Sequence, residues 1–90
     1  MLRDKEYKAD FVAMNIVFSR HAKAKMIQRS IPASIVIGAV RFPDFRFPGR
    51  SGRKELYKSF RKIYLKVIIK ETAIRVIVVT AHLVAKVPKN

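Results

Sequence analysis

The chain has 90 residues, half of them hydrophobic, which is enough for one small domain with a modest core. Cysteine is absent, which excludes disulfide bonds and thiolate metal sites, and the two histidines show no metal-binding spacing. Twenty Lys and Arg against six Asp and Glu give a net charge of +14, which favours an anionic partner, most often a nucleic acid. An acidic protein or an anionic membrane surface would also suit this charge.

Residues 1–15 are predicted to be a polar lead-in, and residues 16–90 a single α+β domain. The lead-in balances three basic residues against three acidic ones, so the excess positive charge lies in the domain. The sequence shows neither a secretory signal nor an apolar run long enough to cross a bilayer. A cytoplasmic protein that does not enter the membrane is therefore expected.

Two helices are predicted in the first half of the domain, after a short strand in the stretch "NIVFS". Ser19 is a good N-cap for a helix over residues 20–29, in which Ala22 and Met26 form a buried stripe. His21, Lys25 and Gln28 then share a neighbouring, exposed stripe, with Arg29 at its edge. Pro32 separates this helix from a second one over residues 33–41.

The second half of the domain has the alternating pattern of β-strands. "FRF" is a candidate short strand, and "RKELYKSF", "IYLKVIIK" and "IRVIVVTAH" follow a basic turn, "PGRSGR". The last strand is apolar on both sides, with Ala81 assigned to the side of Ile77, so it is expected to be central. The predicted fold is α+β, with two N-terminal helices packed on one face of a three- to four-stranded antiparallel sheet. The other face is left for Tyr57, Tyr64, Lys66 and Arg75.

The residue types permit phosphodiester chemistry without a metal or a cofactor. Paired carboxylates, zinc-binding spacings and Gly-rich phosphate loops are all missing from the sequence. RNA can be cleaved through its own 2′-hydroxyl if Arg and Lys stabilise charge on the phosphate and His or Tyr moves protons. Composition alone leaves plain nucleic-acid binding open as well.

The order of "SRHAKAKMIQRSIPASIVIGAV", "FPDF", "RKELYKSF", "IYLKVIIKE" and "IRVIVVTAH" resembles domain of unknown function family 4258, over about residues 16–83. Such domains are similar in layout to the RelE/ParE and BrnT toxins. The resemblance implies a metal-independent ribonuclease of a toxin–antitoxin module, neutralised by a small acidic antitoxin. By this resemblance, His21 and Arg29 match the helix motif, while Arg53, Lys54, Lys66 and His82 match the catalytic region. The family usually has Gly at the place of Ser30.

The leading hypothesis is therefore a toxin-like endoribonuclease that acts on RNA, with ribosome association and a homodimer left open. Its candidate catalytic residues are His21, Arg29 and His82. Its candidate nucleic-acid contacts are the basic residues Lys25, Arg50, Arg53, Lys54, Lys58, Lys66 and Arg75. The alternatives are a non-catalytic RNA- or DNA-binding module and a ParE-like protein inhibitor. The nuclease hypothesis expects the cations to gather on one side of the fold.

Overall fold

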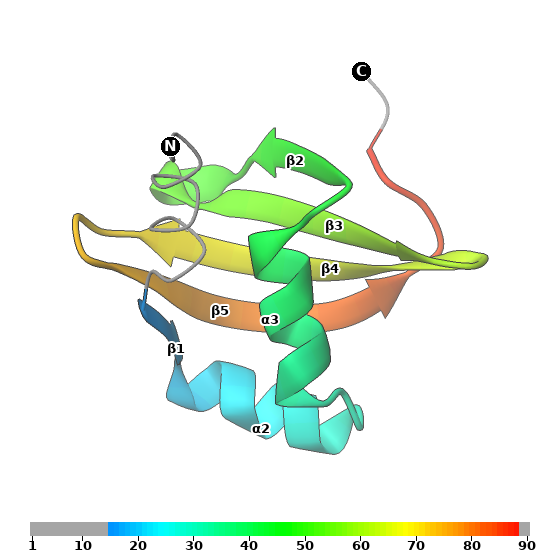
Figure 1. Cartoon of the computed structure of the whole chain (residues 1–90), viewed down its shortest axis with the longest axis horizontal. Helices are drawn as coiled ribbons and strands as arrows, with labels where there is room; N and C mark the ends of the chain where they lie inside the picture. The colour runs from blue at the N-terminus through cyan, green and yellow to red at the C-terminus, as the bar shows by residue number, and fades with distance from the viewer. Residues whose placement is uncertain (1–14, 89–90) are drawn as a thin grey trace, which may run out of the picture.

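The computed structural model describes residues 15–88. One sheet contains all five strands of this part, in the order β1-β5-β4-β3-β2, and Figure 1 shows both helices on the same side of it. The predicted lead-in lies outside the described residues, apart from Asn15. The elements, in chain order, are β1 (Asn15–Phe18), α2 (Arg20–Gln28), α3 (Ala33–Arg41), β2 (Phe45–Pro48), the 3-10 turn η1 (Arg50–Gly52), β3 (Lys54–Phe60), β4 (Ile63–Glu71) and β5 (Arg75–Val84).

The prediction of two N-terminal helices on a three- to four-stranded antiparallel sheet is wrong. The sheet has five strands and is mixed, because β1 runs parallel to β5 while the other three pairs are antiparallel. A strand precedes the helices where the sequence predicted one, in the stretch "NIVFS", and it joins the sheet as an edge strand. The pairing continues past Phe18, since the Ser19 N–H donates to the Val78 carbonyl oxygen at 3.0 Å. A four-residue strand whose partner is about 60 residues away leaves no local sign of its direction.

Ser19 joins the first helix to the sheet. Its hydroxyl oxygen accepts a hydrogen bond from the Ala22 N–H at 2.9 Å, as the sequence predicted for an N-cap, and its hydroxyl donates to the Val79 carbonyl at 3.2 Å. Val79 is an extra residue in β5, because Ile69 pairs with Val78 while Ile68 pairs with Thr80. After the bulge, the side chains of β5 alternate between the two faces in the opposite phase, so Ala81 faces the helices. The prediction that Ala81 shares a side with Ile77 is therefore wrong.

The α2 helix ends in a Schellman motif at Ser30. The Ile31 N–H donates to the Met26 carbonyl at 2.9 Å and the Ser30 N–H to the Ile27 carbonyl at 3.2 Å. This geometry places Ser30 at φ 54°, in the left-handed region where glycine has no side-chain penalty. Ile31 and Met26 are both buried beside the turn, so the motif is fixed by packing as well as by hydrogen bonds.

Replacing Ser30 with Gly should raise the free energy of unfolding by roughly 0.5–1 kcal/mol, because the left-handed conformation then carries no strain. The matched control is Ala24→Gly, at an exposed position inside the same helix, where glycine should lower stability by about 1 kcal/mol. Thermal denaturation compares the two variants, and a lower melting temperature for Ser30→Gly would contradict this account of the turn.

The core lies between the helices and one face of the sheet. A single cluster joins buried residues of both helices with alternating residues of β3, β4 and β5. No helix among residues 15–88 is long and apolar enough to cross a membrane. The opposite face of the sheet, called the open face below, carries the alternate side chains of the same strands. The cluster consists of Ala22, Met26, Ile31, Val36, Ala39, Val40, Leu56, Leu65, Val67, Ile69, Val76, Val78 and Ala81.

Candidate nucleic-acid site

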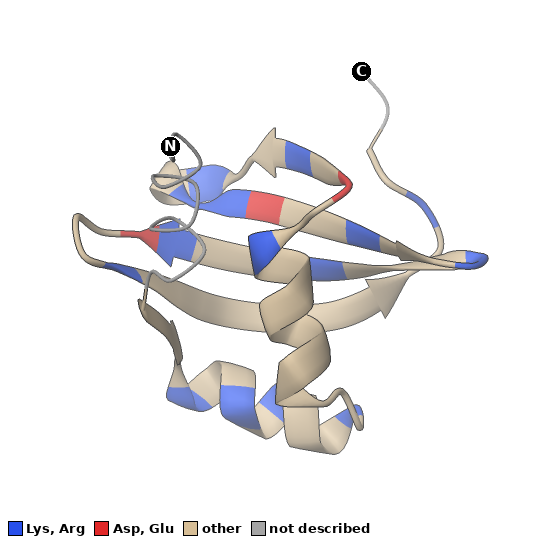
Figure 2. Cartoon of the chain, viewed as in Figure 1, with Lys and Arg blue, Asp and Glu red and all other residues tan. Residues whose placement is uncertain are grey.

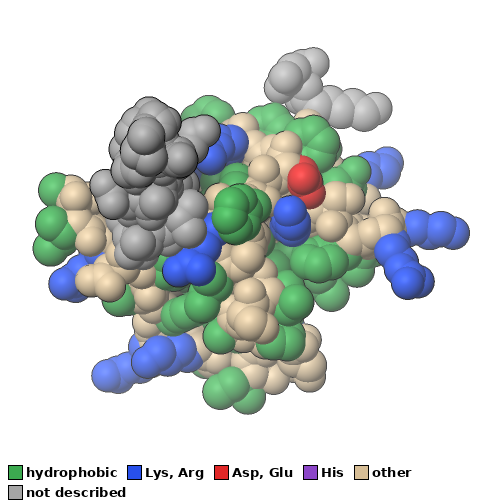
Figure 3. All heavy atoms as spheres, in the orientation of Figure 1, with side chains coloured by type: hydrophobic (Ala, Val, Ile, Leu, Met, Phe, Trp, Pro, Cys, Tyr) green, Lys and Arg blue, Asp and Glu red, His purple; other side chains and the backbone are tan. Residues whose placement is uncertain are grey.

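The positive charge is divided between both sides of the sheet. Figure 2 shows basic residues on α2, on the strands and in the loops, and Figure 3 shows them at separate places on the helix side. On β3, Lys54 and Lys58 share the face of Leu56, which is the helix side, whereas Lys66 of β4 lies on the open face. The candidate RNA contacts therefore do not form the single basic side that was expected.

Three of the candidate RNA contacts lie within 4.0 Å of a carboxylate oxygen, namely Lys54 and Lys58 on the helix side and Lys66 on the open face. The Lys54 ammonium lies 2.6 Å from Glu71, and that of Lys58 lies 4.0 Å from Asp44. Lys58 also donates to the Phe42 carbonyl oxygen at 2.9 Å. Lys54 and Lys58 lie on the helix side of the sheet, whereas His82 lies on the open face, so these two lysines are poor candidates for the catalytic group.

His82 and Lys66 form the centre of a smaller group on the open face. They are directly opposite each other on β5 and β4, which brings their Cβ atoms to about 5 Å. Arg29 reaches the same place from the end of α2, where its Nη1 donates to the Ala81 carbonyl oxygen at 2.9 Å. The Ala81 carbonyl oxygen can accept this bond because the pairing of β1 with β5 ends at Val78, before Ala81 is reached. Arg29, His82 and Leu83 line a hollow of about 380 Å³.

The surroundings of His82 favour a neutral imidazole. Burial lowers the pKa of His82 below its usual value, and the positive charges of Lys66 and Arg29 lower the pKa further. A neutral imidazole at physiological pH can accept a proton, which the ammonium and the guanidinium beside it cannot do. The group called the cationic histidine site below, Arg29, Lys66 and His82, thus combines a base with two anion-binding side chains.

Replacing Lys66 with Gln should raise the pKa of His82 towards its ordinary value, because one of the two positive charges beside the imidazole is removed. The imidazole would then become protonated at a higher pH than in the wild-type protein. An NMR titration of the His82 ring protons measures this shift directly and without any substrate. An unchanged or lower pKa in the variant would show that Lys66 does not act on the imidazole.

Tyr57 supports the site without sharing its acid–base chemistry. The buried Tyr57 hydroxyl donates to Glu55 Oε1 at 3.0 Å, and the Lys66 ammonium lies 5.8 Å from the ring centroid and 3.9 Å from the same carboxylate oxygen. Burial, the hydrogen bond to Glu55 and the charge of Glu55 raise the pKa of Tyr57 to about 12. The phenol is therefore protonated at neutral pH, and Glu55 and Tyr57 hold Lys66 in place.

Not every candidate residue joins this group. His21 is exposed in the first turn of α2, about 12 Å along the helix axis from Arg29. Arg75 is on the open face but at the other end of β5, where it pairs with Asn15. Lys25 lies on α2, where its ammonium donates to Gln28 Oε1 at 3.3 Å. Glu55 was not among the candidate residues, although the alternation of β3 places it on the face of Tyr57.

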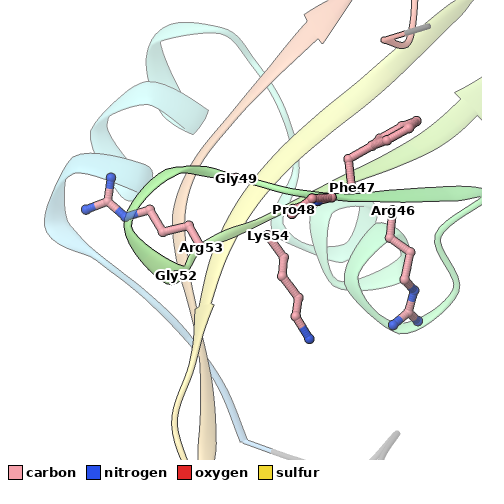
Figure 4. A pocket seen from close by; sticks show the side chains of 7 residues that line it. All are labelled: Arg46, Phe47, Pro48, Gly49, Gly52, Arg53 and Lys54. Atoms are coloured by element: carbon pink, nitrogen blue, oxygen red, sulfur yellow. The ribbon is translucent and has the colours of Figure 1, made fainter. Parts of the chain in front are cut away.

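A second hollow, of about 360 Å³, lies at the β2–η1–β3 corner and is shown in Figure 4. Its basic side chains diverge, since Arg53 points away from Lys54 and Arg46. Arg50 belongs to the adjoining turn, η1. No imidazole lines this hollow, so it offers anion binding but no base. It is lined by Arg46, Phe47, Pro48, Gly49, Gly52, Arg53 and Lys54.

Within residues 15–88 no group of three or more His, Cys, Asp or Glu side chains is placed to hold a metal ion. No family model, no curated protein and no solved structure matches this chain. The resemblance to domain of unknown function family 4258 and to the RelE/ParE and BrnT toxins therefore stays a prediction.

Proposed function

We propose that the protein is a metal-independent endoribonuclease whose active centre is the cationic histidine site. The observation that supports this most is the juxtaposition of a neutral imidazole, His82, with Lys66 opposite it and Arg29 beside it. Such a group provides a base for the 2′-hydroxyl and positive charge for the phosphate. Arg29 uses one of its five N–H donors on Ala81, which leaves others for a phosphate oxygen.

The reaction would follow the intramolecular route that RNA offers. His82 takes the proton of the 2′-hydroxyl while the 2′-oxygen attacks the adjacent phosphorus atom. Arg29 and Lys66 stabilise the negative charge that develops on the phosphate oxygens. The bond from phosphorus to the 5′-oxygen breaks, and this oxygen takes a proton from solvent. The products are a 2′,3′-cyclic phosphate and a 5′-hydroxyl end.

The resemblance also gives the setting of this activity, namely a toxin in the cytoplasm with a small acidic antitoxin. The net charge of +14 supports an acidic partner, because it would relieve the self-repulsion of the basic chain. Ribosome association and a homodimer stay predictions.

The experiment incubates purified protein with single-stranded RNA in EDTA and identifies the ends of the products. The proposal expects cleavage with 2′,3′-cyclic phosphate ends, together with RNA binding that weakens as salt rises. RNA that binds but stays intact would favour the non-catalytic binding module instead. RNA that neither binds nor is cut would overturn both readings and leave the protein inhibitor.

A further inference from the structure

Two aromatic rings lie near the cationic histidine site on the open face. Phe45 of β2 and Tyr64 of β4 meet edge to face, with ring centroids 6.1 Å apart. Ser59 of β3 is directly opposite Tyr64, and its small side chain leaves room for the two rings to meet across β3. Phe45 is 41% exposed and Tyr64 is partly exposed, so this pair, called the aromatic platform below, offers ring surface to solvent.

Phe45 lies in line with Lys66 and His82 across the strands, because Phe45 is opposite Tyr57, Tyr57 is opposite Lys66 and Lys66 is opposite His82. Tyr64 is two residues before Lys66 on β4, so their side chains share the open face. His82 is on the neighbouring strand β5. Phe45 is on β2, the edge strand that is separated from β5 by β4 and β3. With strands about 4.8 Å apart, His82 and Phe45 are separated by roughly 14 Å, the span of a few nucleotides.

A second, more buried pair of rings lies beside the platform on the same face of the sheet. Phe47 contacts Tyr57 edge to face at 5.5 Å between centroids, and Lys66 lies over the Tyr57 ring. Glu55 of this face is already engaged, because it accepts the Tyr57 hydroxyl and lies 3.9 Å from the Lys66 ammonium. The surface that remains combines aromatic rings with positive charge, which is the chemistry that binds single-stranded nucleic acid.

We infer that the aromatic platform stacks a base of single-stranded RNA a few nucleotides away from the phosphate that lies in the cationic histidine site. This inference rests on the proposed function, since it names the class of RNA that the site cleaves. Positive charge on the same face as the rings matches the RNA backbone that leads from the stacked base to the scissile phosphate, and the π-face of any base fits the platform without sequence preference. Duplex RNA keeps its bases paired and stacked inside the helix, so it has none to offer to Phe45 and Tyr64.

Binding is measured with an oligonucleotide made entirely of 2′-O-methyl nucleotides, which cannot be cleaved, and labelled with the fluorescent base 2-aminopurine. Phe45→Leu and Tyr64→Leu keep apolar bulk on their strands and remove one ring face each, so each should weaken binding about 10-fold and reduce quenching of the label. The matched control is Phe42→Leu. Phe42 is also exposed, at 59%, but lies outside the sheet at the C-cap of α3, and this variant should bind like wild type.

Each outcome bears on either the platform or the nuclease. Wild-type affinity in both Phe45→Leu and Tyr64→Leu would overturn the platform, as would equally tight binding of duplex and single-stranded probes. Cleavage of unmodified RNA is assayed in parallel. Cleavage that requires His82 but is indifferent to Phe45 and Tyr64 would overturn the platform alone. Ring-dependent binding without any cleavage would support the platform and overturn the nuclease.

Discussion

Replacing His82 with Gln should lower the rate of RNA cleavage by about 10²–10⁴-fold, because the substrate loses the group that accepts the 2′-hydroxyl proton. Glutamine keeps a polar side chain of similar size opposite Lys66, so the β4–β5 pairing should be retained. Single-turnover cleavage in EDTA measures the effect, and circular dichroism checks the fold.

The second histidine provides the matched control for this experiment. The structure leaves His21 exposed in the first turn of α2 and outside the cationic histidine site. His21→Gln should therefore cleave RNA at the wild-type rate. A loss of cleavage in His21→Gln together with full activity in His82→Gln would reverse the assignment of the base.

Replacing Arg29 with Ala should lower kcat/KM by about 10²–10³-fold, the usual loss when one charge-stabilising donor is removed from a transition state. Arg29 reaches the hollow from the end of α2 and is fixed there by its hydrogen bond to the Ala81 carbonyl oxygen. Its guanidinium can therefore meet a phosphate without first being ordered, which is the physical reason for a large effect.

Arg29→Lys separates charge from geometry at this position. A lysine keeps the positive charge but loses the planar fork, so its kcat/KM should fall between those of wild type and Arg29→Ala. Thermal denaturation of both variants monitors the loss of the contact to Ala81. An Arg29→Ala enzyme within about threefold of wild type would show that the guanidinium does not act on the phosphate.

Local signals in the sequence predicted the helices well. Ser19 was predicted as an N-cap and is one, and the helix after Pro32 has the expected bounds, Ala33–Arg41. Both features depend on the chemistry of neighbouring residues, namely a hydroxyl that meets a free N–H and a proline that disfavours helix before it. The sheet was predicted less well, because β1 pairs with residues about 60 positions away, and because the bulge at Val79 shifts the β4–β5 register without a sign in the alternation of residues.

The candidate site shows the same division between local and long-range information. The sequence selected Arg29, Lys66 and His82 by residue type, but only the fold shows that Lys66 is opposite His82. The density of basic residues also selected Lys54 and Lys58, which the fold places on the helix side of the sheet, away from the face that carries His82. The count of charges therefore predicted an anionic partner without predicting where it would bind.

The most direct test of the account uses a DNA strand that contains one ribonucleotide, incubated with the protein in EDTA. The account predicts a single cut on the 3′ side of the ribonucleotide, a 2′,3′-cyclic phosphate end, and no detectable cut with His82→Gln. Cleavage through the 2′-hydroxyl by the cationic histidine site would be contradicted if the strand with one ribonucleotide stays intact. It would also be contradicted if an all-DNA strand is cut equally well.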